Sequence, residues 1–262
     1  MVIPYFHVDS FTKTIFGGNP AGVCILERWL DDTTLLNIAR ENGLAETSFI
    51  VGNKGKYDIR WFTPEIEMDL CGHATLAAAH VVVKYLYNTN NITFNSASDE
   101  LSIQIEDGLI SMSFPKREPV ISLPPQVLVD SVSIPPKRVL KSRDFIFVYD
   151  SQDDVRDIKV NPAIFNQINI DPGGLCVTAP GVEVDFVSRY FTPQSMILED
   201  PVTGSAHCSL IPFWARELKK NILSARQLSQ RQGELFCENW ENSVLISGYA
   251  VTYKTGEIAL SG

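Results

Sequence analysis

Arg60-Trp-Phe-Thr-Pro64, followed by Leu70-Cys-Gly-His-Ala-Thr75 at the start of an apolar run, decides the fold because the chain contains this pattern twice. Arg189-Tyr-Phe-Thr-Pro193 repeats the first part, and Thr203-Gly-Ser-Ala206 repeats the Cys-Gly-His-Ala of the second part. The two matches occur in the same order and at nearly the same separation. They predict that the chain was built from two similar halves.

A third match precedes the other two. Gly43-Leu-Ala-Glu-Thr47 resembles Gly174-Leu-Cys-Val-Thr178 at a similar offset, so that Glu46 corresponds to Val177 in this alignment. Three matches in one order favour two domains that share a fold and face each other across a cleft.

The boundary between the halves is predicted in the proline-rich stretch 115–136. We therefore expect an N-terminal half of residues 1–116 and a C-terminal half of residues 117–262. Near the end, residues 249–253 and 258–260 have the composition of strands, and Lys254-Thr-Gly-Glu257 is typical of a turn between them. The last of these strands could instead return to pair with the first half.

The segment after Gly72 predicts an enclosed helix. Leu76 to Val83 contains almost no polar side chain apart from His80. A helix that is apolar on all sides is surrounded by other elements, and the β-prone segments before and after it are the expected surroundings. Ser209 to Leu218 predicts the equivalent helix of the second half.

The composition restricts the class of partner. An apolar content of 45% and a charged content of 20% are those of a globular protein, and 262 residues suit two ordinary domains. The net charge of −9 argues against nucleic acid and against an anionic membrane surface. It leaves a small anionic substrate possible, because a site can be locally positive.

The cysteines and the N-terminal sequence favour a cytoplasmic location. Five cysteines are an odd number and include no C-x-x-C pair, which suits reduced thiols better than disulfides. We expect no signal peptide, because no basic segment leads into an apolar run at the N-terminus. The longest apolar stretch is too short to span a bilayer.

The two predicted helix starts are candidate anion sites. Gly72-His73 and Gly204-Ser205 each place a flexible residue where backbone N–H groups and the positive end of the helix dipole are available to a carboxylate. The structural alternative is that both glycines only allow close packing. His73 is the candidate for proton transfer at the first start, since the imidazole titrates near neutral pH; a packed or capping histidine is the alternative.

Two acidic residues are candidates for acid/base chemistry. Glu46 lies within Leu44-Ala-Glu-Thr-Ser-Phe49, where an acid costs free energy unless it is paired. A buried salt bridge, or a cap involving Thr47, is the alternative. Asp200 precedes Pro201 in the turn that leads to Gly204, and we expect it to face the cleft in preference to Glu199.

Cys71 precedes the first helix start and suggests thiol chemistry. A racemase that uses two thiols removes a proton on one face and returns one on the other, so it needs a cysteine in each half. The counterpart of Cys71 in the repeat is Thr203. We therefore favour a packing role for Cys71, with a cysteine-dependent racemase or epimerase kept as an alternative.

These motifs together resemble the PhzF-like phenazine-biosynthesis isomerase family. The resemblance rests on Phe16-Gly-Gly-Asn-Pro-Ala-Gly22, the segments around Glu46, Phe62-Thr-Pro64 and Cys71, Glu199-Asp-Pro-Val-Thr-Gly-Ser205, and the late stretch 227–234. It covers nearly the whole chain. It implies the diaminopimelate-epimerase-like α/β (α+β) fold, with two pseudo-symmetric domains that each wrap a β-barrel-like sheet around a central apolar helix.

The resemblance also implies the chemistry. It implies an isomerase without metal or organic cofactor, in which a glutamate moves a proton along a conjugated cyclohexadiene amino acid. Carried over by motif, the acid/base is Glu46, assisted by His73 and Asp200. Substrate contacts are expected from Ser205, from the backbone of Gly72 and Gly204, and from Asn19. A homodimer is expected on the same ground.

The hypotheses that remain differ in class. The first is a cofactor-independent isomerase acting on a small carboxylate substrate bound between the two halves. The second is the cysteine-dependent racemase with Cys71, and the third is a binding protein that keeps the fold without the chemistry. The sequence does not identify the substrate.

Overall fold

The chain forms two compact units in this computed structural model, which describes residues 1–97, 100–170 and 173–260. Unit 1 comprises residues 1–113 together with the segment from 247 onward, and unit 2 comprises residues 114–246. The predicted boundary after residue 116 lies three residues from this division. The segment from 247 onward lies in unit 1, because its strand pairs with the first strand of that unit. The alternative that the last strand returns to the first half is therefore correct, and the assignment of residues 249–253 to the second half is wrong.

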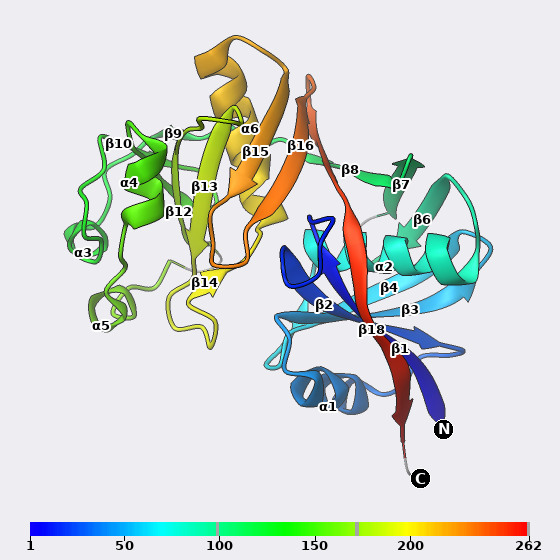
Figure 1. Cartoon of the computed structure of the whole chain (residues 1–262). Coiled ribbons are helices and arrows are strands. Elements are labelled where there is room, and N and C mark those ends of the chain that lie inside the picture. The colour runs from blue at the N-terminus through cyan, green and yellow to red at the C-terminus, as the bar shows by residue number, and fades with distance from the viewer. Residues whose placement is uncertain (98–99, 171–172, 261–262) are drawn as a thin grey trace. The chain divides into compact units, whose positions relative to one another are not determined.

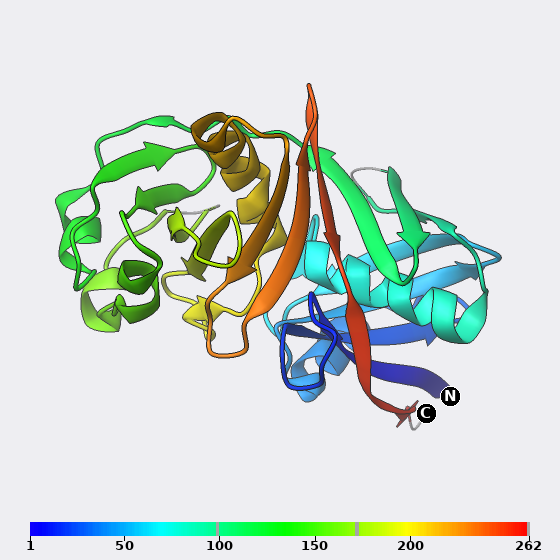
Figure 2. The same ribbon diagram turned by 45° about the horizontal axis from the view of Figure 1, so that its top comes forward.

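Unit 1 is built from strands around one buried helix. Its elements are β1 (Val2–Ser10), β2 (Asn19–Leu26), α1 (Asp32–Asn42), β3 (Glu46–Asn53), β4 (Lys56–Phe62), β5 (Glu67–Met68), α2 (Gly72–Val81), the π-helix η1 (Val82–Leu86), β6 (Asn91–Asn95), β7 (Glu100–Glu106), β8 (Leu109–Pro115) and β18 (Ala250–Ala259). α2 contacts β1, β2 and β3, as the two views of Figures 1 and 2 show. Its residues from His73 to Ala79 are all buried, which confirms the prediction of an enclosed helix.

α1 covers the other face of the same strands. It starts where the side chain of Asp31 accepts a hydrogen bond from Thr34 N, and it ends at Gly43. Gly43 has φ 61, the left-handed conformation that glycine adopts without a steric penalty. Leu35 and Ile38 of α1 pack against Phe49 of β3, so β3 is buried between two helices.

Unit 2 repeats this plan. Its elements are β9 (Val120–Ile121), α3 (Gln126–Asp130), β10 (Arg138–Lys141), β11 (Phe145–Val148), α4 (Gln152–Asp157), α5 (Pro162–Phe165), β12 (Leu175–Pro180), β13 (Phe186–Phe191), β14 (Glu199–Asp200), α6 (Gly204–Leu218), β15 (Ile222–Gln227), β16 (Gly233–Asn239) and most of β17 (Ser243–Gly248). α6 begins at Gly204, in the second of the two helix-start motifs, five residues before the predicted Ser209. Its residues from Ala206 to Ala215 are buried.

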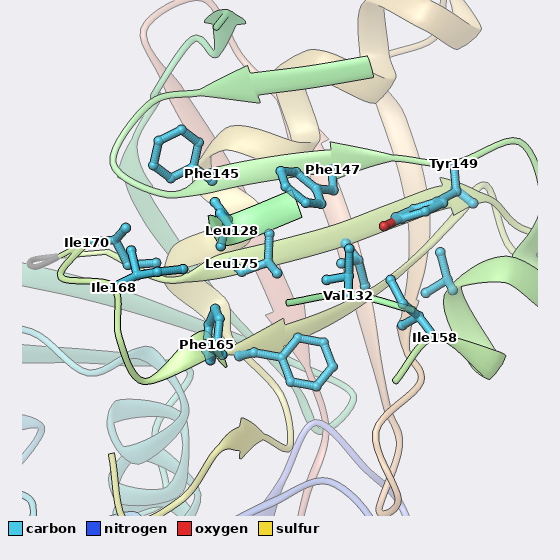
Figure 3. Close-up of a cluster of buried hydrophobic side chains, with 14 of the residues drawn as sticks. Leu128, Val132, Phe145, Phe147, Tyr149, Ile158, Phe165, Ile168, Ile170 and Leu175 are labelled. Atoms are coloured by element: carbon cyan, nitrogen blue, oxygen red, sulfur yellow. The ribbon is translucent and has the colours of Figure 1, made fainter. Parts of the chain in front are cut away.

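Both faces of the sheet in unit 2 are buried, and different helices pack against each face. Alternate residues of β12 point to opposite sides, as the period of a strand requires. Leu175 and Val177 belong to a cluster with side chains from α3, α4 and α5, which Figure 3 shows around Phe147 and Phe165. On the opposite face, Thr178 Oγ1 accepts a hydrogen bond from Trp214 Nε1 of α6 at 2.9 Å.

The strand pairings confirm that the two units share one fold. In unit 1 the successive pairs β1–β2, β2–β3, β3–β4, β4–β6 and β6–β7 are antiparallel, parallel, antiparallel, parallel and antiparallel. The pairs β10–β11, β11–β12, β12–β13, β13–β15 and β15–β16 of unit 2 follow the same order. Each unit thus wraps a mixed sheet around its own central helix.

The register corrects one detail of the repeat. Thr47 pairs with Phe62, and Leu175 pairs with Phe191, the equivalent phenylalanine of the repeated motif. The residue before each is therefore equivalent, so the counterpart of Glu46 is Gly174. The predicted match of Glu46 with Val177 is wrong by three positions, because similar residue types in two apolar strands allowed the alignment to slip.

The predicted turn at Lys254-Thr-Gly-Glu257 is absent. These residues lie in the middle of β18, where Lys254 pairs with His7 and Gly256 with Tyr5. The only irregularity in this pairing is a shift of register between His7 and Val8. Nine residue pairs between β1 and β18 outweigh the local preference of Thr-Gly for a turn. Among the described residues, no helix has the length and apolar character needed to cross a bilayer.

Candidate active site

Glu46 and His73 form the central contact of unit 1. Glu46 is the first residue of β3, and His73 is the second residue of α2. Glu46 Oε2 lies 3.0 Å from His73 Nε2, with side-chain exposures of 16% and 6%. The two atoms are within ion-pair distance without the alignment of a hydrogen bond, and neither has another hydrogen-bond partner in the structure. The two side chains are thus close together and largely shielded from solvent, and the Glu46 side chain remains partly accessible.

The second ring nitrogen of His73 faces Cys71 and Asn19. Cys71 Sγ lies 3.5 Å from Nδ1, and Asn19 Nδ2 lies 3.2 Å from it. A neutral ring accepts from the amide nitrogen of Asn19, whereas a protonated ring donates to the amide oxygen after a half-turn of the side chain. Asn19 is completely buried, so this contact fixes the ring plane.

The surroundings of His73 favour its charged form. Burial alone would lower the pKa of His73, but Cys71 and the Glu46 carboxylate outweigh it and hold this pKa well above its usual range. Burial and the nearby Glu46 raise the pKa of the Cys71 thiol, against which His73 acts only in part. The ring of His73 thus faces a carboxyl group on one edge and a thiol on the other.

The backbone of His73 is held by a residue outside the helix. Ser10 Oγ, at the end of β1, donates to the carbonyl oxygen of His73 at 2.8 Å. Ser10 pairs with Asn19 across β1 and β2, so one strand pair supplies two contacts to the same residue. The regular hydrogen bonds of α2 begin at Thr75, whose N–H donates to Cys71 O. The N–H groups of Gly72 and His73 precede this bond and point out of the helix start.

Glu46, Cys71 and His73 are also the potential metal ligands of this region. One ligand atom from each lies within 4.8 Å of the others. However, the thiol is near Nδ1 and the carboxylate is near Nε2, on opposite edges of the ring. Ligands of one ion converge on a common point, whereas these two contacts lie on opposite edges of the ring. The expectation of a site without metal or organic cofactor stays a prediction.

Asp200 is the candidate acidic residue of unit 2. It ends β14, and its Oδ2 accepts a hydrogen bond from Thr203 Oγ1. The adjacent Glu199 is held by Arg189, with Nε to Oε1 at 2.7 Å and Nη2 to Oε2 at 2.9 Å. The carboxylate of Glu199 is therefore occupied by a structural ion pair, which leaves Asp200 as the candidate. In unit 1, Arg60 holds Glu67 in the same way.

Gly204 and Ser205 form the start of α6, as predicted. Gly204 is buried and Ser205 is half-buried. The residue that precedes this helix is Thr203, just as Cys71 precedes α2. The structure thus brings Asn19, Glu46, Gly72 and His73 together in unit 1, and Asp200, Gly204 and Ser205 together in unit 2.

Gln227 is the residue that the sequence did not single out. It ends β15, is 1% exposed, and contacts both Asp200 and Thr203. The stretch from 227 to 234 was identified as a motif, but no chemical role was attached to its first residue. A buried amide at a strand end is the signal that marks it, and burial is known only from the fold.

Comparison with known proteins identifies the family. The sequence profile of the phenazine biosynthesis-like proteins (PhzC-PhzF) matches residues 8–256. The chain belongs to the PhzF-like family. An isomerase from Pseudomonas aeruginosa is 42% identical over 261 residues, which is 99% of this chain and 100% of that protein.

Solved structures of the family agree with the fold. A PhzF-family protein from Enterococcus faecalis has a TM-score of 0.94 and 40% identity, with 99% of this chain and 100% of that chain covered. A PhzC/PhzF protein from Clostridium difficile has a TM-score of 0.91 and 44% identity, with coverage of 98% and 100%. A probable proline racemase from Agrobacterium radiobacter, at 9% identity and a TM-score of 0.66, shares the fold alone.

The class of enzyme follows from these relatives. Curated family members from Pseudomonas aeruginosa and Halalkalibacterium halodurans, 38–42% identical over nearly the whole chain, are named isomerases. The present chain is an isomerase of the PhzF-like family.

Proposed function

We propose that this PhzF-like enzyme moves a proton between two carbon atoms of a small carboxylate-bearing substrate, with Glu46 as the general acid and base. The supporting observation is the pair of Glu46 and His73, 3.0 Å apart and largely buried. The His73 ring places a titratable nitrogen directly beside the Glu46 carboxyl group. Glu46 is also the more exposed member of the pair, as a group that meets substrate must be.

The proton transfer needs only one such carboxyl group. Glu46 takes a proton from a C–H bond, and the electron pair left behind is delocalised over the unsaturated substrate. The same carboxyl group then returns the proton to a second carbon on the same face. Unlike inversion at one carbon, this step needs no acid on the opposite face.

The remaining candidates assist this step. In the proposal the N–H groups at the starts of α2 and α6 bind the substrate carboxylate, with Gly72, Gly204 and Ser205 as contacts. His73 keeps Glu46 oriented, and Asp200 contacts a polar group of the substrate. If both helix starts bind the same substrate, Asp200→Asn in unit 2 should slow the reaction even though the base, Glu46, lies in unit 1. This variant therefore tests that part of the proposal.

The experiment is a ligand screen followed by proton exchange. Wild type and Glu46→Gln are screened by thermal shift with small amino and hydroxy acids, including unsaturated and aromatic ones. Each acid that stabilises both proteins is incubated in D₂O and followed by NMR. We expect exchange at carbon with wild type and a rate roughly 10²–10⁴-fold lower with Glu46→Gln. A variant with more than a tenth of wild-type exchange excludes Glu46 as the base.

A cysteine-dependent racemase is the second candidate, and the contact between Cys71 Sγ and His73 Nδ1 favours it. The position equivalent to Cys71 is Thr203, whose hydroxyl already donates to Asp200. Cys71→Ser separates the two candidates: the Glu46 mechanism expects a loss of less than tenfold, and the racemase expects near-abolition. Ligands that bind but never exchange with wild type would indicate a binding protein. The homodimer expected from the resemblance is tested by sedimentation velocity.

A further inference from the structure

The hydrogen bonds of Gln227 have a direction that two backbone groups determine. Thr203 N–H donates to Gln227 Oε1 at 2.9 Å, and Gln227 Nε2 donates to Asp200 O at 2.7 Å. A backbone N–H can only donate and a backbone carbonyl can only accept. The amide oxygen and nitrogen of Gln227 are therefore assigned without ambiguity, which is rarely possible for a side-chain amide.

This orientation determines the direction of the next bond. Gln227 Nε2 also donates to Thr203 Oγ1, at 3.2 Å. Thr203 Oγ1 therefore receives one hydrogen from Gln227, and its own hydrogen points to Asp200 Oδ2. Because Thr203 is the donor in this bond, Asp200 Oδ2 is the acceptor and carries no proton on that atom.

Two further hydrogen bonds lie beside this chain and involve none of its side-chain atoms. Ser229 Oγ donates to Pro201 O at 2.8 Å, and His207 Nδ1 donates to Thr203 O at 2.8 Å. Burial lowers the pKa of His207 to about 4, only partly opposed by this bond, so its ring is neutral near pH 7 and adds no charge beside Asp200. Gln227 and Thr203 are both buried, so solvent does not compete for these bonds.

We propose that Gln227 is a positioning residue, which acts through Thr203 to keep the Asp200 side chain a hydrogen-bond acceptor. With Oδ2 held in this way, Asp200 offers its other oxygen to an N–H or O–H group of the substrate. This role of Gln227 rests on the proposed function. It assigns proton transfer to Glu46 and recognition of the donor group to Asp200.

A structural experiment tests the direction of the chain without any turnover. Neutron diffraction from deuterium-exchanged crystals of the wild-type protein locates the deuterons on side-chain oxygens and nitrogens. We expect one deuteron on Thr203 Oγ1 directed at Asp200 Oδ2, and two on Gln227 Nε2 directed at Asp200 O and Thr203 Oγ1. A deuteron bound to Asp200 Oδ2 and directed at Thr203 overturns the proposal.

A kinetic experiment tests the consequence for catalysis, with the acid that exchanges its proton in the wild-type assay described above. Gln227→Met removes both polar ends at similar length, and Thr203→Val removes the hydroxyl while keeping the shape. We expect each to lower the maximal exchange rate roughly 10–100-fold, as misplaced catalytic groups do. Thr203→Ser restores the hydroxyl and should restore the rate.

Ser229→Ala is the matched control, because it removes a neighbouring hydrogen bond of the same turn without touching Asp200. It should leave the exchange rate within about threefold of wild type. Circular dichroism melts of each variant separate lost folding from lost positioning. Wild-type rates in both Gln227→Met and Thr203→Val overturn the proposal. Absence of exchange in the wild type refutes the proposed function instead, and the neutron result still decides the direction of the chain.

Discussion

Arg189 and Arg60 are equivalent residues of the two units, and the structure predicts that they contribute very differently to stability. Arg189 Nη1 donates to Val155 O, Arg156 O and Ile158 O at 2.8–3.2 Å, in addition to the two bonds to Glu199. Side-chain exposure is 14% for Arg189 and 24% for Glu199. Replacing Arg189 by Met leaves a partly buried carboxylate and three carbonyl groups at the end of α4 without their cation.

The magnitude follows from this burial. Removing one partner of a buried, hydrogen-bonded ion pair costs about 3–5 kcal/mol. Arg60 pairs with Glu67 and Asp32, whose side chains are 38% and 79% exposed, so water can replace the lost partner. For Arg60→Met we expect a cost of about 1 kcal/mol. The predicted difference between the two variants is thus about 2–4 kcal/mol.

The assay is urea denaturation combined with hydrogen-exchange mass spectrometry. Peptides from α6 report on unit 2 and peptides from α2 report on unit 1, so each loss of stability is assigned to its own unit. A double-mutant cycle of Arg189→Met with Glu199→Gln isolates the pair from the three carbonyl contacts. Equal losses for Arg189→Met and Arg60→Met would refute the argument from burial.

The remaining predictions concern pH and packing. The pKa of His73 is raised in the folded state, so its contribution to the stability of unit 1 is complete below its unfolded pKa of about 6.5 and is lost as pH rises through the folded value; His73→Asn should flatten this alkaline decline in a series of urea melts. For His207 the folded pKa is lowered to about 4 by burial, so unit 2 keeps this contribution above about pH 6.5 and loses it as pH falls toward 4; an acid limb that persists unchanged in His207→Asn would contradict the assignment. Gly248→Ala places a methyl group 2.4 Å from Phe11 Cδ1 and should cost about 1–3 kcal/mol in thermal unfolding, whereas Gly256→Ala, with no atom within 4 Å of the new methyl group, should cost much less.

The sequence predicted the elements whose signals are local or repeated. The enclosed helix after Gly72 followed from a segment without a polar face. An Asp-Gly pair between two β-prone segments is a local signal of a hairpin, and Asp107 and Gly108, both at positive φ, form the turn between β7 and β8. The two-unit plan followed from the repeated motifs.

What the sequence missed depends on partners distant along the chain. Lys254 to Glu257 have the local character of a turn, yet β1, from the other end of the sequence, holds them as a strand. The register of β12 was misplaced by three residues because only its pairing with β13 distinguishes similar apolar neighbours. Both errors arise because strand register is decided by a partner strand.

The candidate site was predicted in its members but not in its contacts. Glu46, His73 and Asp200 were selected from motifs, and the structure adds what each one touches. The contact of Asn19 with His73 and the role of Gln227 needed the fold, because both are buried amides that only acquire a direction from backbone groups across a strand pair.

The pairing of β1 with β18 makes unit 2 an insertion within unit 1. During synthesis, β1 leaves the ribosome first, but its partner follows only after the whole of unit 2 has been made. Unit 2 is a continuous segment and can fold during this time, whereas one edge of β1 in unit 1 stays unpaired until β18 has been made. Met1 and Leu260 exchange backbone hydrogen bonds at 2.8 and 2.9 Å. A circular permutant that joins Leu260 to Met1 and opens at the Asp107-Gly108 turn would therefore keep the same strand pairings. In this permutant β1 would follow β18 directly in the sequence, so both strands would be available to pair at the same time.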